Sequence, residues 1–408
     1  MSYLKKLLYG VEAEWKSLGE VLIRTKGTSI TAGRMKELHK DGAPLKIFAG
    51  GRTVAFFDYD AIPSKDINRE PSIIVKSRGV IEFEYYDKPF SHKNEMWSYH
   101  SQDEYISIKF VYYFLKIQEP HFQNIAGKMQ MPQISIPDTD KFKIPIPCPE
   151  NPKKSLEIQQ KIVDILDKFT ALKAELTAEL TAELTARKQH YSYYREELFC
   201  FEHTSVRHLP LGDESIGNFI RGGGLQKKDF TENGVGCIHY GQIYTYYGTY
   251  TEKTKSFVSE EFAKKARMAK PGNLIIATTS ENDEDVCKAV AWLGNEEIAI
   301  SSDACFYAHN LIPKFVAYFF QTEQFQKQKR PFITGAKVRR VNADDLAKIK
   351  IPVPPIQEQE RIVSILDKFD ILTTSISEGL PNEIELRKKQ YEYYRNLLLT
   401  FPKDNLES

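Results

Sequence analysis

Gln159-Gln-Lys-Ile-Val-Asp-Ile-Leu-Asp-Lys-Phe169 returns as Gln359-Glu-Arg-Ile-Val-Ser-Ile-Leu-Asp-Lys-Phe369, with an offset of 200 residues and eight of the eleven positions identical. Further along, Arg187-Lys-Gln-His-Tyr-Ser-Tyr-Tyr-Arg195 returns at the same offset as Arg387-Lys-Lys-Gln-Tyr-Glu-Tyr-Tyr-Arg395. An internal repeat indicates the overall architecture of a chain more directly than any local sequence pattern. The chain therefore contains the same structural unit twice.

Weaker matches lie in the same order upstream of each copy. They are Leu18-Gly-Glu20 with Leu211-Gly-Asp213, Lys109–Leu115 with Lys314–Phe320, and Lys141–Pro147 with Lys348–Pro354. Each copy is thus a variable domain of about 150 residues, a proline-rich connector and a helix. The variable domains have diverged almost completely. This pattern fits helices that serve one kind of contact and domains that meet two different halves of an asymmetric ligand.

The helix of the first copy is predicted over about 155–199, with Ser155 as its N-cap, because apolar residues recur every three or four positions. Within it, Ala174–Thr185 repeats the four-residue unit Ala-Glu-Leu-Thr, which favours a rigid helical spacer. Each unit would add about 6 Å of helix. In the second copy Gly379 and Pro381 interrupt the pattern, so a kink or short break is expected there. Equal lengths suggest that the two helices pair as an antiparallel coiled coil.

Composition places the chain among ordinary globular proteins. It has 408 residues, 41% hydrophobic content and a formal net charge of +1, so a polyanionic partner would have to be met by local positive charge. The five cysteines form no Cys-x-x-Cys pair, which argues against a disulfide framework or a zinc ribbon. Glu12 and Glu14 interrupt any leader-like segment, so a cytoplasmic location is expected.

These features together make the chain similar to the specificity subunits of type I restriction-modification enzymes, and the resemblance covers essentially its whole length. It is carried by the repeated helices, the Ile-Pro-x-Pro connectors and Glu14-Trp-Lys-Ser-Leu-Gly-Glu20. The four-residue repeat is like one seen in some members, where its copy number is tied to half-site spacing. The interruption at Gly379–Pro381 departs from the most symmetric members of the family.

The resemblance implies an α/β (α+β) fold with internal duplication, in which two target-recognition domains are separated by two long antiparallel coiled-coil helices. The expected segments are recognition domain 1, spacer helix 1, recognition domain 2 and spacer helix 2, at 1–152, 153–201, 202–354 and 355–408. In that family each recognition domain reads half of a split sequence in double-stranded DNA. Two modification subunits dock along the helices and methylate adenine, and restriction subunits join for cleavage.

The same resemblance implies a chain without catalytic function and without a cofactor of its own. S-adenosylmethionine, ATP and Mg²⁺ are expected on the partner subunits. Consistent with this, Gly127-Lys128 lacks the rest of a phosphate-binding loop, and no Asp/Asn-Pro-Pro-Tyr/Phe tetrapeptide of an amino-methyltransferase occurs. Asp138, Asp140 and Lys141 resemble a metal-nuclease cluster, but a turn leading into a strand is the preferred interpretation.

Residues that bind DNA should be basic or amide side chains on glycine-containing loops, because cations contact phosphates while amides and arginines read base edges. The richest basic stretch is Lys314–Arg340, which includes Lys327, Lys329 and Arg330. Gly127–Gln130 stands at the equivalent place in the first copy. The predicted DNA-binding residues are Arg24, Lys26, Thr28, Ser29, Arg34, Lys36, Lys128, Gln130, Arg221, Gln226, Lys227, Lys228, His239, Tyr240, Gln242, Thr278, Thr279, Lys337, Arg339 and Arg340.

The tyrosine-rich helix ends are predicted to bind partner proteins, since tyrosine and arginine are enriched at interfaces. The alternative is that these helix ends pack against their own domain. The predicted partner-binding residues are Tyr191, Tyr194, Arg195, Tyr391, Tyr394 and Arg395. Two other functions stay open at this point: a self-sufficient DNA nuclease or methyltransferase, and a coiled-coil scaffold without DNA specificity.

Overall fold

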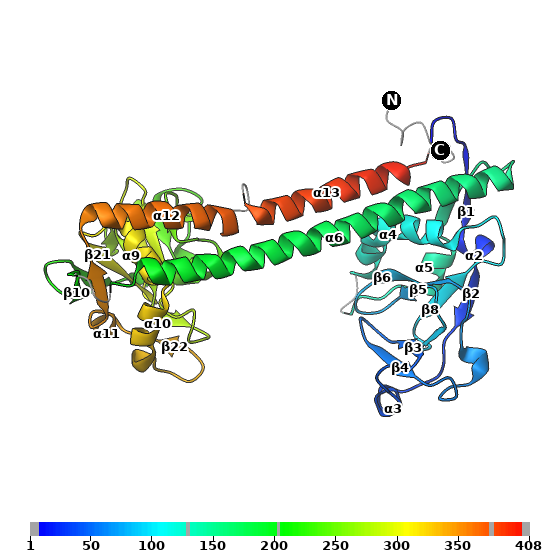
Figure 1. Cartoon of the computed structure of the whole chain (residues 1–408), viewed down its shortest axis with the longest axis horizontal. Helices are drawn as coiled ribbons and strands as arrows, with labels where there is room; N and C mark the ends of the chain where they lie inside the picture. The colour runs from blue at the N-terminus through cyan, green and yellow to red at the C-terminus, as the bar shows by residue number, and fades with distance from the viewer. Residues whose placement is uncertain (1–7, 128–130, 202–204, 375–378, 402–408) are drawn as a thin grey trace. The chain divides into compact units, whose positions relative to one another are not determined.

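The computed structural model describes residues 8–127, 131–201, 205–374 and 379–401 (Figure 1). The chain divides into two compact units, residues 1–178 with 385–408, and residues 179–384. Each unit therefore takes in one variable domain, the beginning of one helical region and the end of the other. The predicted segment boundaries treat each helix as a separate piece, and they stay predictions.

The first unit is a mixed helix and strand domain with two larger sheets and the small sheet β1-β9. An antiparallel sheet has the strand order β2-β8-β5-β6, and a three-stranded sheet has the order β4-β3-β7. Helix α4 (Ile108–Ala126) packs on the first sheet through contacts with β5 and β6 (Figure 1). The remaining bounds are β1 (Ala13–Ser17), α2 (Leu18–Val21), β2 (Ile23–Lys26), α3 (Ala32–Glu37), β3 (Leu45–Phe48), β4 (Val54–Phe57), β5 (Ser72–Lys76), β6 (Glu82–Tyr86), β7 (Phe90–His92), β8 (Trp97–His100), α5 (Ile136–Asp140) and β9 (Lys143–Pro147).

The second unit also combines helices with mostly antiparallel strands. Its larger sheets have the orders β11-β21-β17-β19-β14 and β12-β20-β13-β15. The bounds are β10 (Arg207–Pro210), β11 (Gly217–Arg221), β12 (Gly223–Leu225), β13 (Val235–Ile238), α7 (Tyr240–Thr245), β14 (Tyr250–Thr251), β15 (Ser256–Val258), α8 (Glu260–Ala263), β16 (Met268–Ala269), β17 (Leu274–Ala277), β18 (Thr279–Ser280), β19 (Ala289–Trp292), β20 (Ile298–Ser301), β21 (Ala304–His309), α9 (Pro313–Phe319), α10 (Glu323–Lys329), β22 (Arg339–Arg340), α11 (Ala343–Leu346) and β23 (Lys350–Val353).

The frame that the sequence repeat predicts is present in both units. Strand β1 pairs with β9 in the first unit, and β10 pairs with β23 in the second, both antiparallel. Directly after the first strand of each pair, the Leu18 amide donates to the Phe142 carbonyl at 2.9 Å and the Leu211 amide donates to the Ile349 carbonyl at 2.8 Å. The repeated Leu-Gly-Glu and Leu-Gly-Asp tripeptides therefore open equivalent structures.

The first helix, α6 (Pro152–Leu198), is continuous over 47 residues. It begins three residues before the predicted cap: Asn151 accepts from the Lys154 amide through its side chain at 3.1 Å. Ser155 is instead buried inside the first turns, where its hydroxyl accepts from Gln159 Nε2 at 3.0 Å. Asparagine before a proline is a favourable helix start, so the helix begins at this upstream residue and the prediction of Ser155 as the cap was wrong.

The second helical region forms two helices in the described residues, α12 (Ile356–Thr374) and α13 (Leu380–Leu398). Gly379 is not helical and α13 begins at Leu380, which agrees with the interruption predicted from Gly379 and Pro381. Proline is tolerated in the first turn of α13, because the backbone N–H that it lacks has no intrahelical partner there.

The same three contacts attach a helix to its domain in each unit. In the first unit, Lys109 Nζ lies 2.7 Å from Asp167 Oδ2, and the Tyr113 hydroxyl donates to Asp167 Oδ1 at 2.5 Å. The Gln159 side-chain oxygen accepts from the Ser107 amide at 2.9 Å. Residues of α4 and of the loop before it thus hold the beginning of α6.

The equivalent contacts in the second unit join α9 to α12. Lys314 Nζ lies 2.8 Å from Asp367 Oδ2, the Tyr318 hydroxyl donates to Asp367 Oδ1 at 2.7 Å, and Gln359 accepts from the Ile312 amide at 3.0 Å. Burial and the hydrogen bond to Asp367 raise the pKa of Tyr318 above its ordinary value, so this phenol stays a donor. The repeated residues therefore anchor helices to domains and leave the domain surfaces free to diverge.

Candidate nucleic-acid interface

Four predicted segments of the second unit meet at one turn, Ser301–Asp303, between β20 and β21. Strand β12 pairs beside Ser301, and the Tyr240 amide donates to Ser301 Oγ at 2.9 Å. The Thr278 amide donates to the Asp303 carbonyl at 3.0 Å, and Arg340 Nη2 lies 3.6 Å from Asp303 Oδ1. Residues 221–228, 239–242, 278–279 and 335–340, far apart in the sequence, thus form one surface, which we call the turn-301 surface.

The basic hairpin 334–340 is a largely exposed part of this surface. Gly335 has φ +88°, and a Cβ there would lie 2.1 Å from the Val338 carbonyl oxygen, so the turn requires glycine. Thr334 and Arg340 close the hairpin through reciprocal amide-to-carbonyl hydrogen bonds of 2.9 Å. Lys337 is exposed at its tip. This geometry suits a loop that meets a phosphate backbone.

Arg339 is held in one orientation by two contacts. Its Nε lies 2.7 Å from Asp283 Oδ1, and its Nη1 donates to the Gly335 carbonyl at 2.5 Å. The side chain stays partly exposed, with further guanidinium N–H groups available. An arginine held in this way is suited to bidentate contact with a guanine edge.

The predicted segment 239–242 is engaged mainly in local structure. The His239 ring accepts from the Gly241 amide at 3.2 Å and caps α7. The Gln242 amide group accepts from the His239 backbone at 3.0 Å and donates to Ser256 Oγ at 2.7 Å. Burial lowers the pKa of His239, and nearby Lys227 lowers it further, so the ring is neutral at pH 7.

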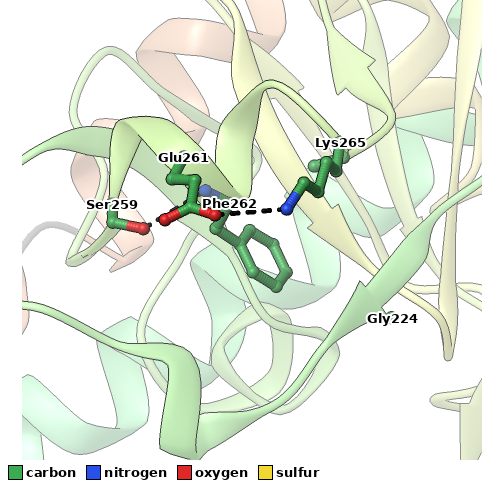
Figure 2. A pocket seen from close by; sticks show the side chains of 6 residues that line it. Gly224, Ser259, Glu261, Phe262 and Lys265 are labelled. Atoms are coloured by element: carbon green, nitrogen blue, oxygen red, sulfur yellow. Dashed lines mark hydrogen bonds and ion pairs between the residues drawn. The ribbon is translucent and has the colours of Figure 1, made fainter.

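A basic segment that the sequence analysis missed lies beside Arg221–Lys228. It runs from Lys264 to Arg267 after α8, and Arg267 Nη1 donates to the Arg221 carbonyl at 2.9 Å. A pocket of about 380 Å³ lies between Gly224 and residues 259–266 (Figure 2). Figure 2 shows Lys265, just after α8, paired with Glu261 on that helix, and the distance between Nζ and Oε1 is 3.2 Å. Lys264 and Arg267 are exposed and extend the positive charge of this surface.

In the first unit the predicted residues lie on β2 and around α3. Arg24 and Lys26 stand on β2, and Arg24 Nε lies 3.6 Å from Asp140 Oδ2. Ser29 is exposed before α3, which also carries Arg34, paired with Glu37 at 3.0 Å, and Lys36. All five side chains are accessible, so they stay candidates.

Lys36 lines a cavity of about 470 Å³ between α3 and the β3–β4 hairpin. Met35, Val54 and alanines form its apolar part, and Lys93 and Glu95 form its polar part. Exposed Arg52 and Arg78 are brought together nearby, because the Gly51 amide donates to the Arg78 carbonyl at 3.3 Å. Neither arginine was predicted, although Arg52 follows Gly50-Gly51 and Arg78 precedes Gly79, the pattern by which the other candidates were chosen.

The structure corrects two predicted contacts, and two more lie outside the described residues. Thr28 and Thr279 are each 3% exposed: the Thr28 amide is bonded to the His92 carbonyl, and Thr279 belongs to the β18–β22 pair. Their side chains are therefore not available to DNA. Lys128 and Gln130 lie outside the described residues.

The basic stretch Lys314–Arg340 is not a single DNA-facing loop. Lys314 is used on Asp367, Lys329 is fully buried, and Arg330 pairs with Glu323 at 3.1 Å. The density of basic residues in the sequence overestimated how many of them can meet DNA, because half of this stretch is helical and faces its own domain.

The carboxylates that resembled a nuclease cluster have structural roles. Asp138 accepts from the Ser135 amide at 2.6 Å and caps α5. Asp140 accepts from the Tyr99 hydroxyl and lies beside Arg24. Within the described residues no group of three or more His, Cys, Asp or Glu side chains is arranged to hold a metal ion. The segment is the short helix α5, which leads into β9, where a turn was expected.

The tyrosines at the helix ends pack on other helices of their own unit. Tyr391 accepts or donates a 3.0 Å hydrogen bond with Thr170, and Tyr394 lies 5.8 Å from the Phe169 ring. In the second unit, Tyr194 stacks on Phe369 at 5.5 Å. These contacts repeat at the 200-residue offset, because Phe169 and Phe369 are equivalent residues.

Tyr191 corrects the partner-binding prediction. It is only 8% exposed and stacks on Phe369, so packing against its own unit describes it better. Arg195 is largely buried beside Gln321, whereas Arg395 lies over the Tyr391 ring. Tyr194 stays accessible at 47% exposed, and the most exposed aromatics of these ends are Tyr193 and Tyr393, 59% and 61% exposed, at equivalent positions that the prediction did not include.

The family described as type I restriction modification DNA specificity domain matches residues 14–186 and 214–386. The chain belongs to this family. The two matched segments have the 200-residue offset of the internal repeat, and each contains one anchored helix start.

Full-length relatives agree with this assignment. The chain is 35% identical to the Escherichia coli type I restriction enzyme EcoR124I/EcoR124II specificity subunit, with 99% of this chain and 98% of the relative covered. It is 28% identical to the E. coli EcoprrI specificity subunit, with 93% and 92% covered. The function is therefore that of a type I specificity subunit, which favours DNA specificity over a scaffold without it.

A solved structure from work on assembly and conformational transition of the type I restriction-modification system has the same fold. It aligns with a TM-score of 0.64 at 14% sequence identity, covering 95% of this chain and 97% of that chain. The likeness concerns the fold alone. Among the described helices of the present chain, none has the length and apolarity to cross a membrane.

Proposed function

We propose that the chain directs partner subunits to a bipartite, asymmetric DNA sequence with a gap of fixed length, each unit reading one half. The observation that carries this proposal is the contrast between the two copies. The helix anchors at Asp167 and Asp367 repeat atom for atom, while the accessible basic surfaces differ in residues and in secondary structure. Two different readers on one repeated frame suit two different half-sites.

The partners in this proposal are two modification subunits, which methylate adenine, and restriction subunits, which cleave. S-adenosylmethionine, ATP and Mg²⁺ act on those subunits, and the present chain contributes recognition without catalysis, in the cytoplasm. The internal repeat supports two identical partners, because equivalent residues such as Tyr193 and Tyr393 are exposed in both copies. Antiparallel pairing of the helices as a spacer is supported within the first unit, where Phe169 meets Tyr394 and Lys173 meets Tyr391.

A genome-wide map of methylated adenines tests the proposal. Cells that carry this chain with its modification partner are compared with cells that carry the partner alone. A split motif with a constant gap, present only with the chain, is the expected result. Absence of any chain-dependent motif would contradict the proposal, and DNA cleavage or methylation by the purified chain alone would show an enzyme instead.

The basic segment after α8 should contribute to affinity without contributing to sequence choice. Replacing Lys264 or Arg267 by glutamine removes one cation from the Arg221–Lys228 side of the turn-301 surface. Each substitution should make the plot of log K for DNA binding against log salt concentration less steep by about 0.9. A complex with one phosphate contact fewer releases fewer counterions from the DNA. Lys348→Gln, an exposed lysine already paired with Asp345, is the matched control. DNA titrations of the assembled complex at several salt concentrations provide the measurement, and an unchanged slope in both variants would remove this segment from the interface.

A further inference from the structure

Lys329, at the end of α10, is a cation without access to solvent. It is 0% exposed, and its ammonium donates to three backbone carbonyls of one loop, Asp283 at 2.8 Å, Glu284 at 3.1 Å and Val286 at 2.9 Å. A buried ammonium is costly unless all its N–H groups are bonded, and three bonds satisfy it completely. The position therefore selects a lysine for the loop that it holds.

That loop, residues 281–286, carries four carboxylates in five positions, from Glu281 to Asp285. Asn282 shapes its turn, accepting from the Asp285 amide at 2.7 Å and donating to the Asp285 carboxylate at 2.8 Å. Four exposed negative charges next to a DNA-binding surface would repel phosphates. An acidic loop beside this surface must therefore have a function other than raising the affinity for DNA.

The reason lies in the next contact, between Asp283 and Arg339. Asp283 gives its backbone carbonyl to Lys329 and its carboxylate to Arg339 Nε, at 2.7 Å. The two loops are also joined by the β18–β22 pair, in which Ser280 faces Arg339. A continuous series of contacts thus runs from α10, through Lys329 and Asp283, to the guanidinium at the turn-301 surface.

The α10 end of this series is rigid. Thr322 caps α10, and Phe325 is fully buried in the core of the second unit. Side chains that read base edges need positions held within a fraction of an ångström, and such positions are set by the groups behind them. Burial lowers the pKa of Lys329, whereas the neighbouring Asp283 and Asp285 raise it.

We propose that Lys329 is a positioning residue for base recognition: it holds Asp283 so that Asp283 holds Arg339 in the orientation that reads one base of the second half-site. This inference rests on the proposed function of the second unit. Lys329 itself touches no DNA, and it acts through the loop 281–286. The acidic loop therefore provides selectivity at one base pair and gives up some non-specific affinity.

The test maps methylated adenines in cells carrying the modification partner with the wild type, Lys329→Met or Asp283→Asn. Asp283→Asn leaves Lys329 and its carbonyl bonds intact, so it breaks the series even if Lys329→Met fails to fold. Both variants should keep the first half-site and the gap, while selectivity at one position of the second half-site falls about tenfold. Lys327→Met, an exposed residue on the same helix, is the control and should leave the motif unchanged.

The outcomes separate the two claims. A wild-type map without a split motif would refute the proposed function. A wild-type motif that stays intact in Asp283→Asn would overturn the role of the series, and so would a uniform weakening of both half-sites, because a merely structural defect has no preference for one base. Relaxed selectivity at the same position in both variants would establish it.

Discussion

Insertion of one Thr-Ala-Glu-Leu unit after Leu184 should widen the gap in the methylated motif by one to two base pairs and abolish modification at the original sites. Four helical residues add about 6 Å, and DNA rises about 3.4 Å per base pair. Because α6 is continuous over 47 residues and contributes to both units, the insertion lengthens a single element. Both half-sites should keep their sequences, since neither reading surface is altered.

The same helix geometry gives a second variant that separates added length from rotation about the helix axis. Four residues turn a helix by about 40°, whereas two residues turn it by about 200°. Leu176, Leu180 and Leu184 are half-buried at four-residue spacing, so the first insertion nearly preserves their common face and the second reverses it. A two-residue insertion should therefore abolish modification rather than widen the gap between the half-sites by a smaller amount. Methylation maps of both variants check this, and an unchanged gap after the four-residue insertion would contradict a spacer role for α6.

The frame of the fold could be predicted because the repeat marks it. Gln159 and Gln359 are equivalent in the repeat, and each makes the same bond to a backbone amide 47 to 52 residues earlier. The start of a new helix at Leu380 followed from Gly379 and Pro381. Local chemistry and repetition are both visible in one sequence, so these features needed no knowledge of tertiary contacts.

The site was predicted less completely, because exposure depends on tertiary contacts. Lys329 and Lys337 look alike in the sequence, yet one is fully buried and the other lies at the tip of a hairpin. Thr279 is unavailable to DNA because it lies in a strand pair that joins residues about 60 positions apart. Conversely, Lys264 and Arg267 follow two glutamates, a pattern typical of a solvent-exposed helix. Only the bond from Arg267 to the Arg221 carbonyl places this segment at the turn-301 surface.

Replacing Gly222 by alanine should be among the most damaging single changes in the second unit. A Cβ at this position would lie 2.0 Å from the Ser301 carbonyl oxygen and 2.9 Å from that of Ala304, both backbone atoms. Strand β12 would have to move away from the turn at Ser301. Overpacking of this kind costs about 3 kcal/mol, which corresponds to a fall of roughly 6–12 °C in the melting temperature of a unit of this size.

Gly224, two residues further, offers a matched comparison because a Cβ there meets no atom within 4 Å. Gly224→Ala should change the melting temperature by less than about 2 °C, as surface substitutions usually do. Since Arg221 and Gln226 flank β12, Gly222→Ala should also erase the second half-site from the methylation map while Gly224→Ala preserves it. Thermal melts and maps of the two variants measure both effects. Equal behaviour of the two alanines would mean that β12 does not lie against the turn at Ser301, and the assignment of residues 221–228 to the turn-301 surface would then be wrong.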